Sequence, residues 1–591
     1  MSTISSPGTK IDTSPEASPN RAAPNRAWLK RIVFLGTALA IVLGIFSATT
    51  HRPVLLKQPE QIASKFDASV LEAARKVDRE FQDAWSSHDH RPAPQAPWHT
   101  VARRVSLGMV GNGLSLEEYR SLEKIPEDQR VAWWTEYLLD DRRWADHFAE
   151  RFARATVGTN NGPFLIYRRR KYVDWLADRF QENVAYDQLV RKILVARGSW
   201  TDSPEVNFLT ATMDESDNSK PDAVRLAGRT SRAFLAMRID CLQCHNDYLG
   251  NVKFPSLEDS QDQDNKESLR IGQQSDFHQL AAYFGGVRME NPFSGLKDER
   301  EAYKTKYLGQ ESETEVAPSV PFEERWCSEQ STSRQGLADW VTHTSNRAFA
   351  RATVNRVWAI LSGRPLVQPI DDIPAAGPFP PGLEPLVDDF IEHRYDLKRL
   401  VRVIVATGVY QIDSQWSQGD STETEMIDQE YEKSWAVFPV SQLRPEQMAA
   451  AVHQACRLKT IDASSSILSQ LEMFGGVNEF TMAYGSRGED EFAEQSVTVP
   501  QRLLMMNGAY LSERIGNNPI MNAATRIAGL ARDDATAVQT AFVTTLNRPA
   551  DDKEQKYFVQ RLVGKRGEAR SRELGDLYWV LLNSSEFQWN H

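Results

Sequence analysis

The sequence predicts a mainly α-helical protein in which two helical domains follow an N-terminal transmembrane helix and strands are minor. Three observations lead to this fold class. Apolar residues recur at steps of three and four over long segments, which is the spacing of one buried helix face. Few segments alternate apolar and polar residues over five or more positions, as half-buried strands do. Residues 32–50 form an uncharged, largely apolar run.

The N-terminal part predicts a membrane anchor. Residues 1–31 are rich in Ser, Pro, Thr and Asn without apolar periodicity, which is typical of a disordered tail. Residues 32–50 would span roughly 29 Å as a helix, close to the thickness of a bilayer's hydrocarbon core. Because Arg26, Lys30 and Arg31 flank the N-terminal end of this run, the tail should stay in the cytoplasm. We therefore expect a single-pass protein of the inner (cytoplasmic) membrane with its body on the periplasmic side. A cleaved signal peptide and a buried core helix are the alternatives.

Amphipathic helices are expected from Phe66 onward. The first has apolar residues at helical spacing, namely Val70, Leu71, Ala74, Val77, Phe81 and Trp85. Three prolines within residues 90–98 end it. Further helices are expected around residues 115–124, 127–155, 170–198 and 222–238. Ser115 followed by Glu118 predicts a capping box at the start of one of them.

The second half of the chain predicts another helical block. Residues 255–275 are polar and mostly acidic and predict a solvated loop, and the chain is irregular from about 290 to 330. Helical patterns resume near Ser333, and Pro445 suits a first helical turn. One core helix has an apolar face made by Leu397, Leu400, Val401, Ile404 and Val405. The expected organisation is a tail (1–31), an anchor (32–50), a first helical domain (66–290), a linker (291–332) and a second helical domain (333–591).

Composition excludes several classes of function. The chain has 591 residues and a net charge of −11, so it lacks the excess of Lys and Arg that general nucleic-acid binding requires. Four cysteines are too few for a disulfide scaffold at this length. The sequence contains no G-x-S-x-G, no H-E-x-x-H, no P-loop and no G-x-G-x-x-G after a strand.

The segment IDCLQCHN contains a C-x-x-C-H pattern made by Cys241, Cys244 and His245. With four Cys and eleven His in the chain, chance would produce this pattern about 5 times in 10,000. In c-type haem attachment the two thiols add to the vinyl groups of the porphyrin, and the following His is the proximal iron ligand. We therefore expect a covalent haem c on Cys241 and Cys244 with His245 bound to the iron.

Other interpretations of the pattern stay open. Structural zinc normally needs a second Cys/His pair, whereas Cys327 and Cys456 are solitary. A thioredoxin-type dithiol needs a βαβ setting, which the sequence does not predict. A short structural disulfide between Cys241 and Cys244 would fit an oxidising compartment.

A second axial ligand would be His or Met. His278 and His147 lie in helical patterns and are candidates for the distal position, although single histidines in helices are more commonly packing or capping residues. Met237, four residues before the motif, is more typical of a core residue. A filled sixth position favours electron transfer, and an open one favours ligand binding or catalysis. The sequence leaves both open.

Two further polar stretches could carry function. Asp371 and Asp372 form a carboxylate pair, which would give weak support to a hydrolase, but adjacent acids more often cap a helix or form a salt bridge. The stretch YRRRKY (167–172) could bind a haem propionate or an acidic glycan, or it could be a salt-bridged helix face.

Long stretches of the chain carry a family resemblance. In the first half these are ARRVSLGMVGNGLSLEEYRSL, RRWADHFAERFARATVGTNNGPFLIYRRRKYVDWLADRFQENVAYDQLV, SRAFLAMRIDCLQCHN and DFHQLAAYFGG; in the second, LADWVTHTSNRAFARATVNRVWAILSGRPLVQPIDDI, YDLKRLVRVIVATGVYQIDS, QLRPEQMAAAVHQA, TVPQRLLMMNG, AFVTTLNRPADDKEQ and LYWVLLNSSEFQWNH. Residues from about 66 to 286 thus resemble the planctomycete-specific cytochrome-type domain of unknown function. Residues from about 333 to 591 resemble the planctomycete-specific C-terminal domain that usually accompanies it.

The resemblance implies an exported or membrane-attached protein associated with the breakdown of complex polysaccharides. It assigns the family's motif to Cys241, Cys244 and His245, and His147 and His278 fall where relatives often have His. Relatives commonly continue the motif as C-x-x-C-H-[ND]-H, whereas this chain has Asn246-Asp247. If that second His serves a second metal or the distal side, this chain has lost it.

Our leading hypothesis is a membrane-anchored, exported c-type haem protein with an electron-transfer or other redox role linked to polysaccharide metabolism. Its partners would be the membrane, through the N-terminal helix, and a redox protein or polysaccharide-degrading enzymes. The alternative is a non-haem cell-surface scaffold or binding protein with a structural Cys241–Cys244 disulfide. Whether the protein is an enzyme is left open.

Overall fold

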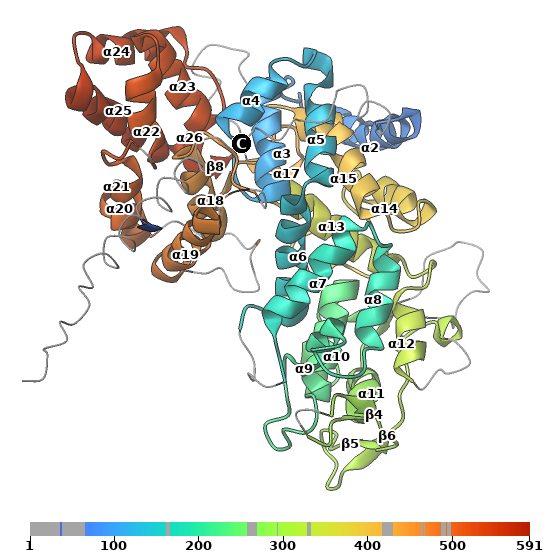
Figure 1. Cartoon of the computed structure of the whole chain (residues 1–591). Coiled ribbons are helices and arrows are strands. Elements are labelled where there is room, and N and C mark those ends of the chain that lie inside the picture. Colours follow the sequence, from blue (N-terminus) through green and yellow to red (C-terminus); the bar gives the residue numbers. More distant parts are fainter. Residues whose placement is uncertain are drawn as a thin grey trace, which may run out of the picture. The chain divides into compact units, whose positions relative to one another are not determined.

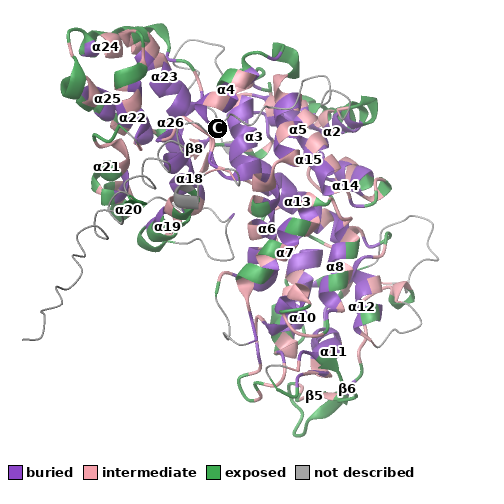
Figure 2. Cartoon of the chain, viewed as in Figure 1, coloured by how far each residue is buried: buried purple, intermediate pink, exposed green. Residues whose placement is uncertain are grey.

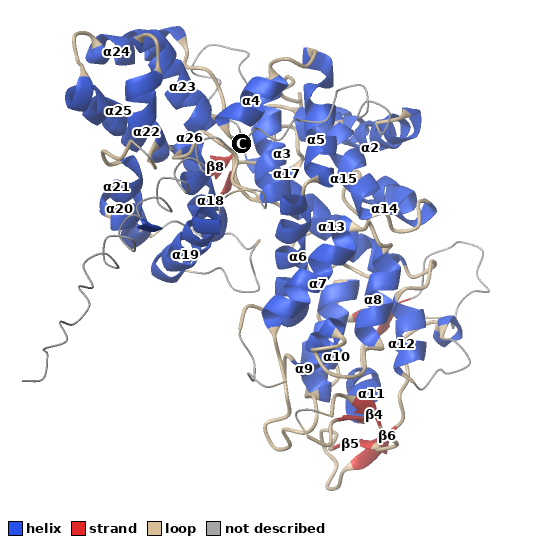
Figure 3. Cartoon of the chain, in the orientation of Figure 1, coloured by secondary structure: helices blue, strands red, loops and turns tan. Residues whose placement is uncertain are grey.

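The structure is a computed structural model that describes residues 36–37, 66–160, 166–256, 269–291, 294–327, 333–415, 429–462, 465, 467–485, 492, 498–519 and 521–591. Helices dominate this part of the chain and strands are short (Figures 1 and 3), which confirms the predicted mainly α fold class. The predicted tail and anchor lie outside the described residues, apart from Gly36 and Thr37. In the described part, no helix is long and apolar enough to cross a membrane.

The first half of the chain folds into successive helices. They are α2 (Ala68–Ser87), α3 (Trp98–Val110), α4 (Leu116–Leu122), η2 (Glu127–Gln129), α5 (Arg130–Asp140), α6 (Arg142–Val157), α7 (Arg169–Gln181), α8 (Tyr186–Leu194), η3 (Pro204–Val206), α9 (Asn207–Thr210), α10 (Ala223–Leu235), η4 (Asp240–Gln243) and α11 (Gln274–Gly285). The prediction of one helix over 127–155 is wrong, because the Asp141 side chain accepts the N–H of Arg143 and starts α6 as an N-cap. The helix predicted over 170–198 is likewise interrupted, since Asn183 takes a left-handed φ of 55°.

The second half is also helical. Its helices are η5 (Glu324–Trp326), α12 (Arg334–Val341), α13 (Arg347–Ser362), α14 (Leu383–Glu392), α15 (Leu397–Ala406), α16 (Gly408–Gln411), α17 (Gln429–Lys433), α18 (Pro445–Ala455), α19 (Ile467–Tyr484), α20 (Val499–Asn507), α21 (Ala509–Ile515), α22 (Ala523–Leu530), α23 (Asp534–Leu546), α24 (Asp552–Leu562), α25 (Gly567–Leu582) and α26 (Ser585–Gln588). The predicted core helix is α15, whose five predicted core residues are all buried. Pro445 opens α18, as predicted.

The described strands form two-stranded antiparallel sheets. They pair β1 (Lys253–Pro255) with β2 (Leu269–Ile271), β3 (Val287–Arg288) with β4 (Lys297–Asp298), β5 (Tyr303–Thr305) with β6 (Thr314–Val316), and β7 (Ser441–Gln442) with β8 (Trp589–Asn590). The stretch from 290 to 330 was expected to be irregular, but it contains short strands. The sequence did not reveal them because strands of two or three residues are too short to show a period of two. The predicted loop at 255–275 begins at the last residue of β1, contains β2 and ends in the first turn of α11, and residues 257–268 lie outside the described part.

Buried side chains form two main hydrophobic clusters (Figure 2). The first contains residues from α2 to residue 438 together with Phe492 and draws on both predicted helical domains. Within it, Phe349 of α13 stacks on Tyr186 of α8 with ring centroids 5.5 Å apart. The second consists of Leu107 of α3 and residues from 443 to 587. A continuous apolar core thus links the predicted domains, whose boundaries stay a prediction.

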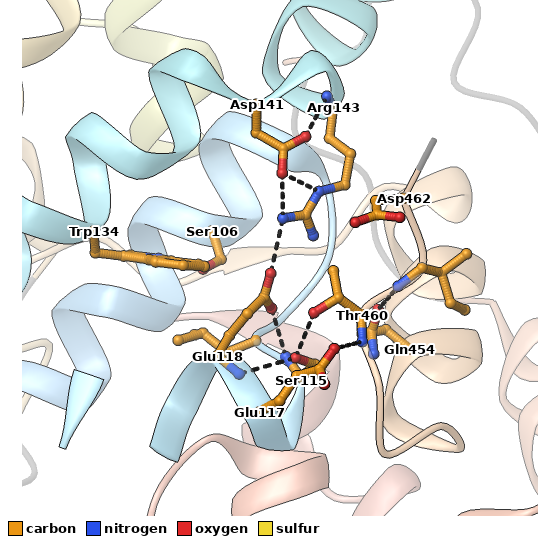
Figure 4. A network of polar contacts seen from close by, with 12 residues as sticks. Ser106, Ser115, Glu117, Glu118, Trp134, Asp141, Arg143, Gln454, Thr460 and Asp462 are labelled. Atoms are coloured by element: carbon orange, nitrogen blue, oxygen red, sulfur yellow. Dashed lines mark hydrogen bonds and ion pairs between the residues drawn. The ribbon is translucent and has the colours of Figure 1, made fainter. Parts of the chain in front are cut away.

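A polar network joins the start of α4 to α6 and to the segment after α18 (Figure 4). The predicted capping box is confirmed: the Glu118 N–H donates to Ser115 Oγ (3.2 Å) and the Ser115 N–H donates to Glu118 Oε2 (2.8 Å). Glu118 also pairs with Arg143 at 2.8 Å. Ser115 Oγ lies 2.8 Å from Thr460 Oγ1, and the Thr460 N–H donates to Glu117. Local helix capping and tertiary contact therefore use the same side chains.

A buried arginine of α3 fixes the C-terminus. Arg104 has no exposed surface, and its Nη1 donates to the carbonyls of Tyr410 and Ile412. Its Nε donates to the carbonyl of His591 at 3.3 Å. The guanidinium carbon lies 3.3 Å from the ring centroid of Phe438. One side chain thereby joins α3, the end of α16 and the last residue of the chain, which lies beside α3 in Figure 1.

We expect Arg104→Leu to lower the free energy of unfolding by roughly 3–5 kcal/mol, because each buried carbonyl left without a donor costs about 1–3 kcal/mol. Urea unfolding followed by circular dichroism measures the loss. Arg75→Leu, on the exposed face of α2, is the matched control and should stay within about 0.5 kcal/mol of the wild type. Equal stabilities of the two variants would contradict the role assigned to Arg104.

His453 of α18 predicts a stability that depends on pH. This side chain is buried in the second cluster, and its Nδ1 lies 3.4 Å from Nε of Arg514. Burial first, and then Arg514 and Arg457, lower the pKa of His453 to about 3. Between about pH 6.5 and pH 3, His453 is protonated in the unfolded chain but neutral in the folded protein. The free energy of unfolding therefore decreases as the pH is lowered, by up to about 1.4 kcal/mol per pH unit.

We expect urea midpoints to fall between pH 6.5 and 4.5, and to fall less steeply in His453→Gln. Titrations of both proteins at matched pH values provide the comparison. Parallel pH profiles would show that His453 does not contribute.

Candidate haem-attachment site

The C-x-x-C-H motif lies on a short 3₁₀ turn with one buried and several exposed side chains. Helix α10 ends at Ala236, which adopts a left-handed φ of 49°, and η4 follows. Leu242 is fully buried, whereas Cys241, Cys244 and His245 are exposed. The N–H of Cys244 donates to the carbonyl of Cys241 at 3.3 Å, which closes the turn. The turn is thus fastened by its one apolar residue and presents the three motif side chains to solvent.

The imidazole of His245 is held in one tautomer. Its Nδ1 lies 2.7 Å from the carbonyl oxygen of Asn246. Because a carbonyl can only accept, Nδ1 carries the hydrogen and Nε2 keeps its lone pair. The ring also stacks on Tyr248, with centroids 5.9 Å apart. Metal-binding histidines commonly donate their second N–H to a carbonyl in this way.

The two thiols are separate and accessible. Cys241 and Cys244 form no disulfide with each other. Burial, with a contribution from the carboxylate of Asp247, raises the pKa of the Cys241 thiol, which therefore stays protonated near neutral pH.

Exposed apolar side chains lie close to the motif in the chain and in the fold. Tyr248 is 73% exposed and Leu249 is 85% exposed, both directly after the motif. Leu308, between β5 and β6, is 67% exposed, and its N–H donates to Gln274, the first residue of α11. The N–H of Gln274 in turn donates to Asn246 (2.8 Å), which brings Leu308 into the same neighbourhood. Exposed apolar side chains thus lie near the motif, either next to it in the chain or linked to it through Gln274.

The segment that leads into the motif is anchored by the loop at 371–373. The guanidinium of Arg238 contacts Oδ1 of Asp371 through Nε (2.8 Å) and Nη2 (2.7 Å). The backbone N–H of Arg238 donates to the carboxylate of Asp372. The N–H of Ile373 donates to the carbonyl of Ala236 at 2.8 Å. The carboxylate pair therefore serves in a salt bridge, the interpretation favoured from the sequence.

The other side of the turn is held by α11. The carbonyl of Gln243 accepts Nε2–H of Gln274 (3.1 Å) and Nε2–H of His278 (3.0 Å). Nδ1 of His278 lies 2.9 Å from the hydroxyl of Tyr303 in β5. Burial lowers the pKa of His278, which favours the neutral ring, so Nδ1 accepts a hydrogen bond from the hydroxyl of Tyr303. The predicted ligand His278 thus lies close to the motif, but its imidazole is hydrogen-bonded to the backbone of the motif.

Asp247 occupies the position at which the family resemblance implies a second His. Its carboxylate accepts the N–H groups of Leu249 (3.1 Å) and Val252 (2.5 Å), and these backbone donors lower its pKa. Its own N–H donates to the carbonyl of Gly272 at 3.0 Å. A Cβ at Gly272 would come within 2.9 Å of a methyl of Leu242, so glycine allows this close approach. In this chain the position organises the loop that follows the motif.

His147, the other predicted distal ligand, lies at a different place in the fold. It belongs to α6, and a Cβ on Gly111 would lie 2.8 Å from its Nδ1. Burial first, and then Arg151 and Arg444, lower its pKa far below the usual value. Arg151 pairs with Glu446 of α18 at 2.6 Å. In the described part of the chain, no hydrogen bond, ion pair or ring contact joins His147 to the motif.

Sequence reasoning found the motif but missed the residues that support it. Gln274 and Tyr303 follow no motif, and Arg238 becomes significant only through its distant partner Asp371. In the stretch YRRRKY, Arg169 pairs with Glu150 at 2.9 Å, as a salt-bridged face would. In the described part of the chain, no group of three or more His, Cys, Asp or Glu side chains is placed to hold a metal ion.

Two family models match the chain. Residues 76–254 match PSCyt2 and residues 333–464 match PSD1, each described as a protein of unknown function (DUF1549 and DUF1553). The matches occur in the order predicted from the resemblance, so the chain contains both of these domains. No curated protein and no solved structure matches it. The motif lies in the first domain and the loop at 371–373 in the second, so the second domain fastens the segment that leads into the motif.

We expect Arg238→Ala to loosen the motif. Without the contacts to Asp371, backbone amides of residues 239–246 should exchange hydrogen roughly three- to tenfold faster, as the loss of a half-exposed ion pair implies. Hydrogen–deuterium exchange by mass spectrometry provides the measurement. Arg225→Ala removes an exposed ion pair of α10 and should leave these amides unchanged. Unchanged exchange in Arg238→Ala would contradict the anchoring role.

Proposed function

We propose that this protein is a c-type haem protein with a redox role. The observation that carries the proposal is the tautomer of His245: its Nδ1–H donates to the carbonyl of Asn246 and leaves the Nε2 lone pair for iron, beside two accessible thiols.

The residues present fit a covalent haem. Cys241 and Cys244 would each add their S–H across a vinyl group, with sulfur bonding to one carbon and hydrogen to the other, so no oxidant or leaving group is required. Both cysteines are free and exposed, and burial raises the pKa of the Cys241 thiol, which favours its protonated form near neutral pH. Tyr248, Leu249 and Leu308 offer apolar surface to a macrocycle that would otherwise face water.

Each supporting residue has a stated task. His245 would bind the iron, and the carbonyl of Asn246 would increase the basicity of Nε2 by accepting Nδ1–H. Arg238 and Gln274 hold the two ends of the motif. The haem, when bound, supplies one-electron chemistry between ferrous and ferric iron.

The proposal extends to location and partners. Membrane attachment through residues 32–50 would place the motif in the periplasm, where haem c is attached. The family resemblance adds a redox protein or polysaccharide-degrading enzymes as partners. These parts rest on the sequence and on the resemblance.

We expect the full-length protein, expressed with the cytochrome c maturation machinery, to keep haem after denaturation. A peroxidase stain of the denaturing gel and a Soret band detect it, and intact mass should rise by one haem. Cys241→Ser with Cys244→Ser should lose the haem, whereas Cys327→Ser, outside the motif, should keep it. A wild-type mass lower by about two units, with no haem, would support the structural disulfide and the scaffold function in its place.

A further inference from the structure

We infer that the described part of the chain gives the iron one axial ligand, His245, and that His278 is a positioning residue. The opposite axial position is then open to a small ligand from solution. This inference rests on the proposed haem function and deepens it. It changes the expected role from electron transfer alone to binding of a small molecule or anion at the iron.

The hydrogen bonds of His278 leave it no lone pair for a metal. Its Nε2–H donates to the carbonyl of Gln243, and its Nδ1 accepts the hydroxyl of Tyr303. A neutral imidazole has one donor and one acceptor, and both are used here. Burial raises the pKa of Tyr303 to about 12, so the phenol stays protonated and keeps its role as donor.

The burial of His278 also separates it from the exposed side of the turn. His278 is 3% exposed, and its ring packs against those of Tyr303 and Tyr307. Cys241, Cys244 and His245 are exposed. To reach an iron outside the turn, His278 would have to break both hydrogen bonds and leave the phenol of Tyr303 without an acceptor, at about 1–3 kcal/mol for a buried group.

The other residues predicted from the sequence as a second axial ligand do not take the place of His278. His147 packs against Gly111, the C-cap of α3, and the charges of the paired Arg151 and Glu446 act on it. Met237 is half-buried and packs against the first hydrophobic cluster. Among described histidines other than His245, only His278 has a contact with the motif, and that contact is with a backbone carbonyl.

An open axial position on an exposed turn predicts a class of ligand. Small π-acceptor molecules and small anions bind haem iron that lacks a second protein ligand. The motif lies on the surface, so such ligands would need no tunnel through the core. Carbon monoxide for the ferrous state and cyanide for the ferric state are suitable probes.

The test uses the full-length haem-loaded protein. We expect a high-spin or weakly ligated ferric spectrum by absorption and electron paramagnetic resonance. We also expect a Soret shift on adding carbon monoxide to the reduced protein. A low-spin spectrum in both oxidation states that resists carbon monoxide and cyanide would overturn the inference. Absence of covalent haem would remove the proposed function itself, which the denaturing gel reveals first.

Two variants separate a ligand from a positioning residue. His278→Gln keeps a side-chain N–H for the carbonyl of Gln243 and should leave spin state and carbon monoxide binding unchanged. His278→Ala should speed amide exchange at residues 241–245 and lower haem yield, with spin state unchanged in the haem-bearing fraction. His343→Gln, at an imidazole outside the site, is the matched control. A change of spin state in His278→Gln would identify His278 as a ligand, even if His278→Ala fails to fold.

Discussion

The buried guanidinium of Arg104 is the interaction on which the described fold most depends. Removing a guanidinium from water costs several kcal/mol unless its donors find acceptors, and here backbone carbonyls instead of a carboxylate accept from Nε and Nη1 of Arg104. Its neighbour Arg103 acts in the same way on Phe587 (2.9 Å) and Thr545 (3.3 Å). Burial lowers the pKa of both to about 10, so both remain charged near neutral pH. Helix α3 thereby fixes segments that are more than 300 residues away in the chain.

The same dependence on distant partners joins the two family domains. The first hydrophobic cluster includes side chains from both, such as Tyr186 and Phe349. At the candidate site each domain supplies one partner of an ion pair: Asp371 of the second domain holds Arg238 of the first. Cutting the chain between the domains would separate residues that share one core and would free the segment before the motif. The second domain is therefore part of the site's support.

How much the sequence revealed depended on the range of the interaction. Helix α15 and the capping box at Ser115 are local patterns and were predicted correctly. The break at Asp141 was missed because one capping side chain can divide a helix while the apolar spacing continues. The C-x-x-C-H motif is defined by residues that are close together in the sequence, so it was found from the sequence. Its supports were not, because Asp371 meets Arg238 across 133 positions and no spacing rule extends so far.

The exposed position of the motif is compatible with holding a cofactor because the proposed attachment is covalent. A non-covalent cofactor depends on an enclosed apolar pocket for its affinity, whereas two thioether bonds require only that the turn stay rigid. Rigidity is what the surrounding residues provide: Leu242 is buried beneath the turn, and Gln274 and His278 share the carbonyl of Gln243.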